Sequence, residues 1–250
     1  MNMNLILFSF CSIFPLFASA ISKKVITFII AEREYSTEKS IPQFAKKNLD
    51  PQFNLEYCKA PKEGERRNFL GNVSAISTAD LLFVSVRRRA FREKTMKLIR
   101  KHISLGKPII ALRTSSHAFD LKKSPVPKGH QTWPRWDRDI IGGNYNGHHS
   151  KGITCNIERV PASVPSPLLK GVQLPFNTPG TLYKNSPLPP HSVAILTGSI
   201  AGFQEEPVAW THRTASGSKV FYTSLGHTED FQKKAFTQLL LNAIHWSTEK

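Results

Sequence analysis

The sequence predicts an α/β fold built on a doubly wound sheet. Short runs of β-branched and apolar residues alternate along the chain with segments that carry an apolar stripe at helical spacing. Several of the runs show little alternation of apolar and polar residues, which is typical of parallel strands covered on both faces. With 250 residues, 40% hydrophobic and 21% charged, the chain has a globular composition and enough length to bury a core without disulfides.

The first half of the chain predicts four strands and two helices. Thr37 is suited to cap the first helix, and Gly106 is suited to end the second, whose apolar face includes Phe91 and Ile99. The order of these elements favours a sheet with right-handed crossovers between its strands. The predicted strands are Lys24–Ala31, Phe53–Cys58, Asp80–Val86 and Pro108–Leu112, and the predicted helices are Thr37–Asn48 and Phe91–Leu105.

The second half begins with an irregular region. Residues 121–190 hold most of the prolines, and we interpret them as loops and short strands attached to the sheet. The helix Asp230–Trp246 follows, with an apolar stripe at helical spacing and Asp230 as its N-cap. We expect residues 21–250 to form one domain. The predicted later strands are Ser192–Gly198, Pro207–Thr211 and Lys219–Leu225.

The first twenty residues predict a secretory signal peptide. Leu5–Phe17 is an almost unbroken apolar run, too short to span a bilayer, and the small-x-small sequence of residues 18–20 follows it as a cleavage site. An uncleaved anchor and a cytosolic protein with a misassigned start are the alternatives. We expect a secreted or periplasmic protein without stable membrane insertion after cleavage. Cys58 and Cys155 then remain, and whether they pair is open.

The formal net charge of +16, from 34 Lys and Arg against 18 Asp and Glu, is the unusual feature of the composition. Such a charge is compatible with nucleic acid, an anionic membrane surface or an anionic ligand. The sequence has no helix-turn-helix, zinc-finger or aromatic RNA-binding motif. We therefore expect no nucleic-acid partner, and we expect part of the charge to bind an oxygen-rich small molecule.

Polar residues gather where the predicted strands end. In an open α/β sheet the ligand crevice lies beyond the carboxyl ends of the strands, so these groups are expected to converge on one cleft. The arginine run after the third strand has an alternative interpretation as a solvated turn. The candidate residues are Glu34 and Tyr35 after the first strand, Arg87, Arg88 and Arg89 after the third, Arg113, Ser115 and His117 after the fourth, and His227 and Glu229 after the last.

The loop Ile141–His149 is rich in turn-forming and polar residues, and such a loop can cover a cleft. His148 and His149 cannot both face one metal ion if the segment is extended. His117, His148 and His227 are therefore candidates for a three-histidine site with an open position. A divalent metal remains an open cofactor assignment.

Six segments, in order, carry a resemblance to a known family: Ala31–Tyr35, Asp80–Ala90, Gly106–Pro108 with Arg113–Phe119, Gly142–His149, Pro207–His212 and Val220–His227. Together they resemble the trehalose-utilisation (ThuA-like) family over residues 24–247. The resemblance implies a flavodoxin-like three-layer sandwich with a mostly parallel sheet, similar to the class I glutamine amidotransferase superfamily. It also implies a substrate of the sugar class.

Comparison with amidotransferases argues against glutamine hydrolysis. Those enzymes carry a cysteine nucleophile on a tight turn after a strand, and the resemblance aligns Arg113 with that position. Arginine stays protonated and cannot act as a nucleophile. The His227-x-Glu229 pair matches the second amidotransferase element. Ser115 or Ser116 is an alternative nucleophile for His227 to activate, but the Gly-x-Ser-x-Gly motif is absent.

The resemblance and the candidate residues together predict an exported enzyme of trehalose-like or keto-sugar catabolism that uses acid–base chemistry. Hydrolysis, elimination and isomerisation all remain open. The alternative is a non-catalytic module that binds carbohydrate or a polyanion on the same fold. The expected catalytic residues are His227, Glu229, His117 and Glu34, and the expected substrate-binding residues are Arg113, Arg87, Arg88, Arg89, Tyr35, Ser115, His148, His149 and His212.

Overall fold

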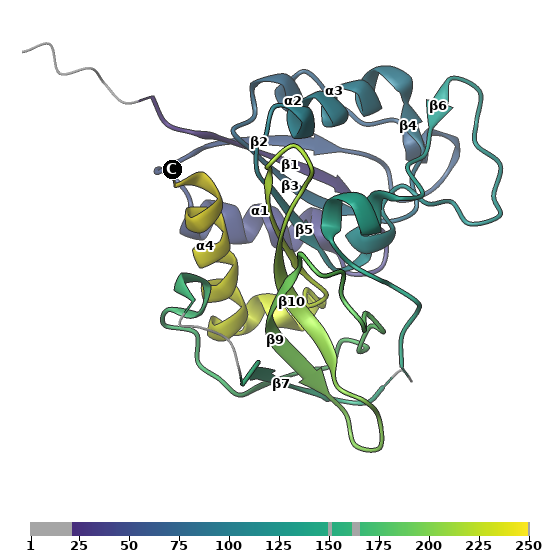
Figure 1. Ribbon diagram of the computed structural model, residues 1–250. Coiled ribbons are helices and arrows are strands. Elements are labelled where there is room, and N and C mark those ends of the chain that lie inside the picture. Colours follow the sequence, from purple (N-terminus) through teal and green to yellow (C-terminus); the bar gives the residue numbers. More distant parts are fainter. Residues whose placement is uncertain (1–21, 150–151, 162–165, 250) are drawn as a thin grey trace, which may run out of the picture.

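A nine-stranded sheet forms the centre of the protein (Figure 1). It is seen in a computed structural model that describes residues 22–149, 152–161 and 166–249. The strand order is β2-β1-β3-β5-β11-β10-β9-β7-β8. The predicted signal peptide at residues 1–20 lies outside the described residues.

One half of the sheet is a block of five parallel strands, β2, β1, β3, β5 and β11. Its strands coincide closely with the apolar runs of the sequence, because strands buried on both faces need hydrophobic residues at nearly every position. All six residues of β3 are buried. The bounds are β1 Val25–Ala31, β2 Asn54–Lys59, β3 Leu81–Val86, β5 Ile109–Leu112 and β11 Lys219–Thr223.

The other half of the sheet is antiparallel, and it extends the parallel block from β11 outward. Two of its strands come from the irregular region at residues 121–190, so this region contributes to the same sheet. The bounds are β7 Cys155–Arg159, β8 Phe176–Thr178, β9 Val193–Ser199 and β10 Glu206–Arg213. A separate two-stranded ladder pairs β4, Phe91–Arg92, with β6, His130–Gln131.

Helices cover both faces of the sheet and bury two separate apolar cores. The helices α1 and α4 pack on one face through residues such as Phe44 and Phe236. The helices α2 and α3 pack on the other face through residues such as Ile76 and Ile99. The bounds are α1 Thr37–Asn48, α2 Ala75–Thr78, α3 Glu93–Ser104 and α4 Lys234–Thr248. The protein is thus a flavodoxin-like three-layer α/β sandwich, which confirms the predicted fold class.

Two helix starts differ from the sequence prediction. The helix predicted from Phe91 begins at Glu93, because Phe91 and Arg92 pair with β6 instead. The helix predicted from Asp230 is divided: a short 3₁₀ turn, η5 at Thr228–Gln232, precedes α4. The other short turns are η1 Glu65–Asn68, η2 Arg113–His117, η3 Asp137–Ile141, which is a π-helical turn, and η4 Pro167–Leu169.

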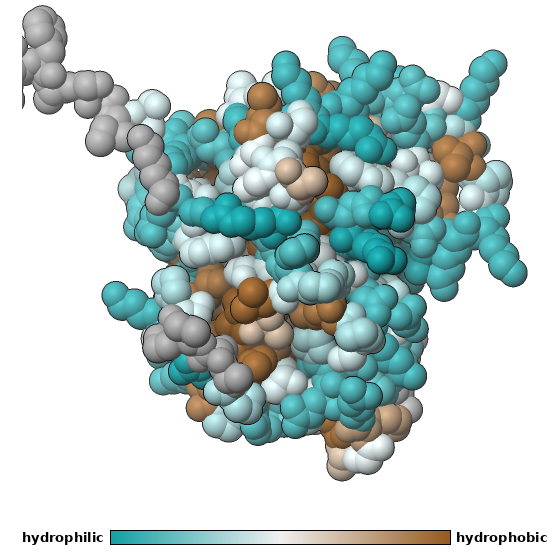
Figure 2. Space-filling view, in the orientation of Figure 1, coloured by the Kyte–Doolittle hydropathy of each residue, from teal (hydrophilic) through white to brown (hydrophobic). Residues whose placement is uncertain are grey.

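The face drawn in Figure 2 is mostly hydrophilic, and hydrophobic residues also reach the surface at the tip of the β9–β10 hairpin. None of the helices in the described ranges is long and apolar enough to cross a bilayer. Cys58 and Cys155 are both buried and free, so they do not form a disulfide with each other. The parallel strands β1, β3, β5 and β11 end at one edge of the sheet, and the polar groups that follow them meet there.

Candidate functional site

The polar groups predicted to converge at the strand ends do contact one another. The Arg113 side chain, after β5, lies over the ring of Tyr35, which follows β1. Tyr35 in turn meets the edge of the His227 ring, with 5.8 Å between the ring centroids. The Arg87 guanidinium, after β3, forms an ion pair of 2.8 Å with Glu34. The topology therefore brings the four predicted groups to one edge of the sheet.

Arg113 is held in place by neighbouring residues and is almost fully buried, with 3% of its surface exposed. Its Nη1 donates to the carbonyl of Ser224 at 2.6 Å, and its Nη2 donates to Tyr35 Oη and Thr181 Oγ1, both at 3.2 Å. The guanidinium also lies 5.0 Å from the ring centroid of Tyr183. Because these contacts hold both Nη atoms, we assign Arg113 a role in positioning Tyr35 and Tyr183, while its buried Nε has no partner among the described residues.

The backbone at this turn is strained. Arg113, after β5, has a φ of 46°, and Arg88, after β3, has a φ of 48°. These angles lie in the left-handed region, which residues other than glycine rarely adopt. Each residue follows a buried parallel strand, and backbone strain of this kind clusters at functional sites, although Ser36, Asn72 and Lys122 also have positive φ angles. Gly180 is needed beside Arg113, because a Cβ there would lie 2.9 Å from Arg113 Nη1.

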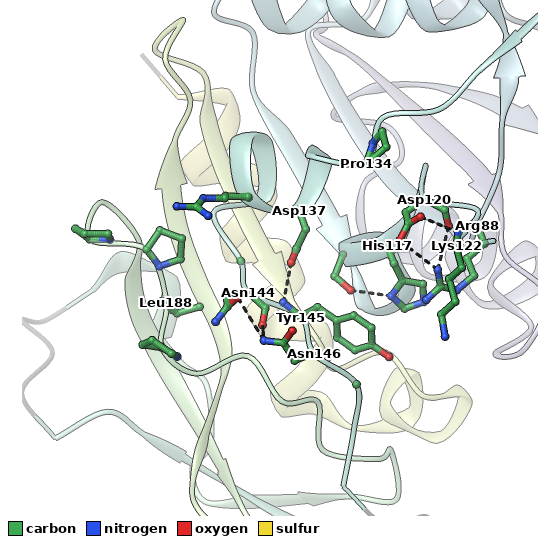
Figure 3. Close-up of a pocket in the computed structure, with 17 residues that line it drawn as sticks. Arg88, His117, Asp120, Lys122, Pro134, Asp137, Asn144, Tyr145, Asn146 and Leu188 are labelled. Atoms are coloured by element: carbon green, nitrogen blue, oxygen red, sulfur yellow. Dashed lines mark hydrogen bonds and ion pairs between the residues drawn. The ribbon is translucent and has the colours of Figure 1, made fainter. Parts of the chain in front are cut away.

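A cavity of about 760 Å³ lies beside this edge of the sheet. Of the predicted catalytic and binding residues, Arg88 and His117 line it, together with Ser116 and part of the predicted covering loop, and with residues that sequence reasoning did not select (Figure 3). The lining residues come from three parts of the chain. They are Arg88, Ser116, His117, Asp120 and Lys122 after the parallel strands, Pro134, Asp137, Arg138 and residues 143–147 from the middle segment, and residues 187–190 from the segment before β9.

His117 enters the cavity wall as a neutral imidazole. Burial, reinforced by the nearby cations Arg88 and Arg87, lowers the pKa of His117 to about 2. A hydrogen bond of 3.0 Å joins its Nδ1 to Ser116 Oγ. Its ring stacks on that of Tyr145, with 4.6 Å between the centroids. His117 is therefore suited to hydrogen-bond a ligand and to shape the cavity, but not to accept a proton at neutral pH.

Asp137 is the residue of the cavity that is best prepared for proton transfer. Burial raises the pKa of its carboxyl to about 7, although a hydrogen bond from the backbone N of Tyr145 to Oδ2, at 2.8 Å, acts in the opposite direction. The other oxygen, Oδ1, is buried and has no hydrogen-bond partner among the described residues. A carboxyl with a pKa near 7 can both donate and accept a proton at neutral pH.

Asp137 and His117 are linked by Tyr145. The backbone of Tyr145 binds the carboxylate, and its ring stacks on the imidazole, so the two groups lie on either side of one residue (Figure 3). The Tyr145 ring also contacts Tyr183, with 4.8 Å between centroids. Gly143 is required nearby, because a Cβ there would lie 2.5 Å from Asp137 Oδ1.

The three arginines after β3 have different surroundings. Arg87 pairs with Glu34, as described above, and Arg88 Nη1 donates to the carbonyl of Asp120 at 3.0 Å. Arg89 is buried, and it donates only to backbone carbonyls, those of Ala31 and residues 61 and 62. The alternative interpretation of residues 87–89 as a solvated turn does not describe the whole run, because Arg89 is buried.

His227 and Glu229 are placed differently from the predicted catalytic pair. The backbone N of Glu229 donates to His227 Nδ1 at 3.3 Å, so the imidazole caps the turn η5. The Asp230 carboxylate accepts hydrogen bonds from the backbone N atoms of Gly226 and His227, both at 2.9 Å. The two side chains form no hydrogen bond or ion pair with each other in the part of the chain that the structure describes, and neither residue lines the cavity. In this structure His227 is the N-cap residue of the turn η5.

Three other predicted binding residues, Ser115, His149 and His212, do not line the cavity. Ser115 is buried, and its Oγ donates to the carbonyl of Val84 at 2.8 Å. His149 contacts Glu206 at 3.4 Å, and His212 bonds Ser192 Oγ at 3.1 Å.

The candidate three-histidine metal site is not formed within the described residues. His117 and His227 have the separate surroundings given above, and His148 Nδ1 bonds the carbonyl of His149 at 2.8 Å. Across residues 22–149, 152–161 and 166–249, no group of three or more His, Cys, Asp or Glu side chains is placed to hold a metal ion.

The sequence model of the trehalose-utilisation family, ThuA, matches residues 31–247. The chain belongs to the ThuA family. A putative ThuA-like protein from Bacteroides uniformis has the same fold, with a TM-score of 0.64, 16% identity, and 91% of this chain and 92% of that chain covered. One from Parabacteroides merdae gives a TM-score of 0.61, 15% identity and coverage of 91% and 90%. No curated protein gives a match to this ThuA-family chain.

Proposed function

We propose that this ThuA-family protein is an enzyme of carbohydrate catabolism and that its cavity binds a sugar derivative, such as a trehalose-like disaccharide or its keto form. The observation that carries the proposal is Asp137, a mostly buried carboxyl whose pKa lies near 7 in a cavity of about 760 Å³. Titratable groups with strongly shifted pKa values in concave sites are characteristic of acid–base catalysis. The family description supplies the sugar class.

We assign proton transfer to Asp137. Hydrolysis, elimination and isomerisation of a keto-sugar each need a group that takes a proton from the substrate or gives one to it. His227 is less suited to this role, because its Nδ1 already accepts the backbone N–H of Glu229. Arg88 and Lys122, which line the same cavity, would hold the hydroxyl or carbonyl oxygens of the sugar and any negative charge that develops on them.

A second candidate function is a non-catalytic module that binds carbohydrate. It is favoured by the turn after β5, where the resemblance aligns Arg113, which is buried, with the nucleophile of amidotransferases. This candidate predicts ligand binding without product, and it gives no special importance to the protonation state of Asp137.

Export remains part of the proposal. We infer from the apolar run and the small-x-small site at residues 5–20 that the protein is secreted or periplasmic. Expression of the full chain in a Gram-negative host, followed by cell fractionation and mass spectrometry, should give a periplasmic protein that begins at residue 21. A cytoplasmic protein of full length would contradict this inference.

The activity is tested with the wild type and two variants on a panel of disaccharides and 3-keto-disaccharides, with products followed by mass spectrometry and binding by calorimetry. Asp137→Asn should lower turnover by about 10²- to 10⁴-fold while binding is retained. Asp139→Asn is the matched control, since Asp139 lies on the same turn η3 but pairs with Arg135. Binding without turnover by the wild type would favour the binding module, and full turnover by Asp137→Asn would refute the assignment.

A further inference from the structure

A second, smaller hollow of about 120 Å³ lies at the same edge of the sheet. We call it the arginine pocket, because five of the residues that line it are arginines. Two of them come from separate segments of the chain, and three are the run after β3. The lining consists of Arg33, Arg67, Arg87, Arg88 and Arg89, with Leu121 and Ser124.

Several guanidinium nitrogens of the arginine pocket are free to bind a ligand. Nε and Nη2 of Arg89 donate to backbone carbonyls, whereas Nη1 has no acceptor among the described residues. Arg87 Nε also lacks a partner within the described ranges, but it is buried, so it is an unsatisfied donor of this region and not one exposed to the hollow. Arg33 and Arg67 make no side-chain hydrogen bond or ion pair with any residue that the structure describes. The pocket therefore has donors in excess of the acceptors that the protein supplies.

The charges of the arginine pocket are also unbalanced. Glu34 pairs with Arg87 at 2.8 Å, and Asp120 lies 3.6 Å from Arg88. The third nearby carboxylate, Glu32, accepts hydrogen bonds from the backbone N atoms of residues 34 and 35. The lining itself contains five guanidinium groups and no carboxylate. Burial and, after it, the neighbouring cations Arg67 and Arg33 lower the pKa of Arg89 to about 10.

The arginine pocket adjoins the larger cavity. Arg88 lines both hollows, and the short segment 120–124 contributes Asp120 and Lys122 to the cavity and Leu121 and Ser124 to the arginine pocket. Because Arg88 is common to both linings, we take the two hollows to be close enough for one ligand to place its sugar ring in the cavity and an anionic group among the arginines. Planar guanidinium groups are the preferred donors to tetrahedral oxyanions, because they present paired N–H groups to two oxygens.

We propose that the arginine pocket binds a sulfate or phosphate group carried by the sugar that occupies the neighbouring cavity. This inference rests on the proposed function for the identity of the ring, but the anion site itself is defined by the arginines. It narrows the substrate class from neutral sugars to sugar sulfates or sugar phosphates. It also assigns a specific role to part of the net charge of +16.

The test measures binding by calorimetry at fixed, near-physiological ionic strength. The probes are inorganic sulfate, inorganic phosphate, glucose 6-sulfate, glucose 6-phosphate and neutral glucose. The pocket variant is Arg33→Gln with Arg67→Gln, chosen because neither side chain supports the fold through a hydrogen bond in the described residues. The matched control is Arg92→Gln with Arg213→Gln, which removes the same charge from exposed positions that line neither hollow. Circular dichroism confirms that each variant is folded.

We expect a sugar sulfate or sugar phosphate to bind about tenfold or more tightly than either glucose or the inorganic ions. The pocket variant should weaken this binding by about tenfold or more for each guanidinium removed, and the control should leave it unchanged. The ester that binds more tightly identifies the group as sulfate or phosphate. Equal losses of affinity in the two variants would show a non-specific charge effect and would overturn the proposal. Sugar esters that bind no more tightly than the free inorganic ions would also overturn it.

A separate arm distinguishes failure of this inference from failure of the proposed function. Asp137→Asn should retain tight binding of the anionic sugar, because Asp137 does not line the arginine pocket. If the anionic sugar binds but no panel substrate is turned over, the enzyme proposal fails and the anion site stands. If turnover of neutral keto-sugars is normal and the pocket variant behaves like the control, the anion site fails and the enzyme proposal stands.

Discussion

Replacing Asp137 by asparagine should stabilise the protein at neutral and alkaline pH. Burial raises the pKa of the Asp137 carboxyl from its ordinary value of 3.8 to about 7, so the folded protein holds this proton more tightly than the unfolded chain does. In the interval between these two values the folded state binds more protons, and stability therefore falls as the pH rises. Asparagine resembles the protonated acid in shape, and it carries no charge to bury.

The magnitude follows from the same two pKa values. Raising the pKa from 3.8 to about 7 corresponds to about 4 kcal/mol, and water that enters the cavity to solvate the carboxylate would reduce this to about 2–3 kcal/mol. Below about pH 4 the wild type and Asp137→Asn should have the same free energy of unfolding. The advantage of the variant should grow through the acid range and level off above about pH 7.

The assay is urea unfolding followed by tryptophan fluorescence at a series of pH values between about 4 and 8.5. Asp139→Asn is the control, because this carboxylate forms an ion pair with Arg135 near the surface and its removal should change stability by less than about 1 kcal/mol. A difference between Asp137→Asn and the wild type that does not vary with pH would refute the reasoning, since it would mean that the carboxylate is well solvated in the folded protein.

Three further outcomes can be checked directly. Gly180→Ala should cost about 1–3 kcal/mol in urea unfolding because its Cβ would collide with Arg113, whereas Gly71→Ala, where the nearest atom is 3.6 Å away, should change stability by less than about 1 kcal/mol. The imidazole of His117, whose pKa burial lowers to about 2, should not titrate between pH about 5 and 8 in NMR spectra assigned with His117→Gln; a titration in that interval would contradict its burial. Burial raises the pKa of the Cys58 thiol to about 12, so it should resist a disulfide reagent in the folded protein and react after unfolding in urea, and rapid reaction of the folded protein would contradict the structure.

The parallel half of the sheet could be predicted from the sequence, because burial on both faces imposes apolar residues at almost every position. The runs at β1, β3 and β5 are such signals, and the polar groups after them followed from topology alone. The antiparallel half could not be predicted in the same detail. β7 has only five residues and β8 only three, so neither is long enough to show a reliable pattern of alternation.

The candidate site likewise has a part that could be predicted from the sequence and a part that could not. Arg88 and His117 could be found because they follow strands, but the burial of Asp137 depends on contacts with Gly143 and Tyr145 that form only in the folded chain. The glycine pair at 142–143 was the one local signal, since a small residue is required where backbone approaches a buried side chain. The capping role of His227 was hidden because a His-x-Glu sequence does not reveal which atoms of the two residues meet.

One wall of the cavity has a consequence for how a ligand is selected. Pro187, Pro189 and Pro190 line it on one side and Pro134 on another, and proline rings lock the backbone φ angle and have few side-chain conformations to lose. The residues of such a wall lose little conformational entropy when a ligand binds, but they also cannot rearrange around a molecule of the wrong shape. We therefore expect selection among stereoisomeric sugars to come from steric exclusion at the prolines, and replacing Pro189 by alanine to broaden the range of sugars that bind.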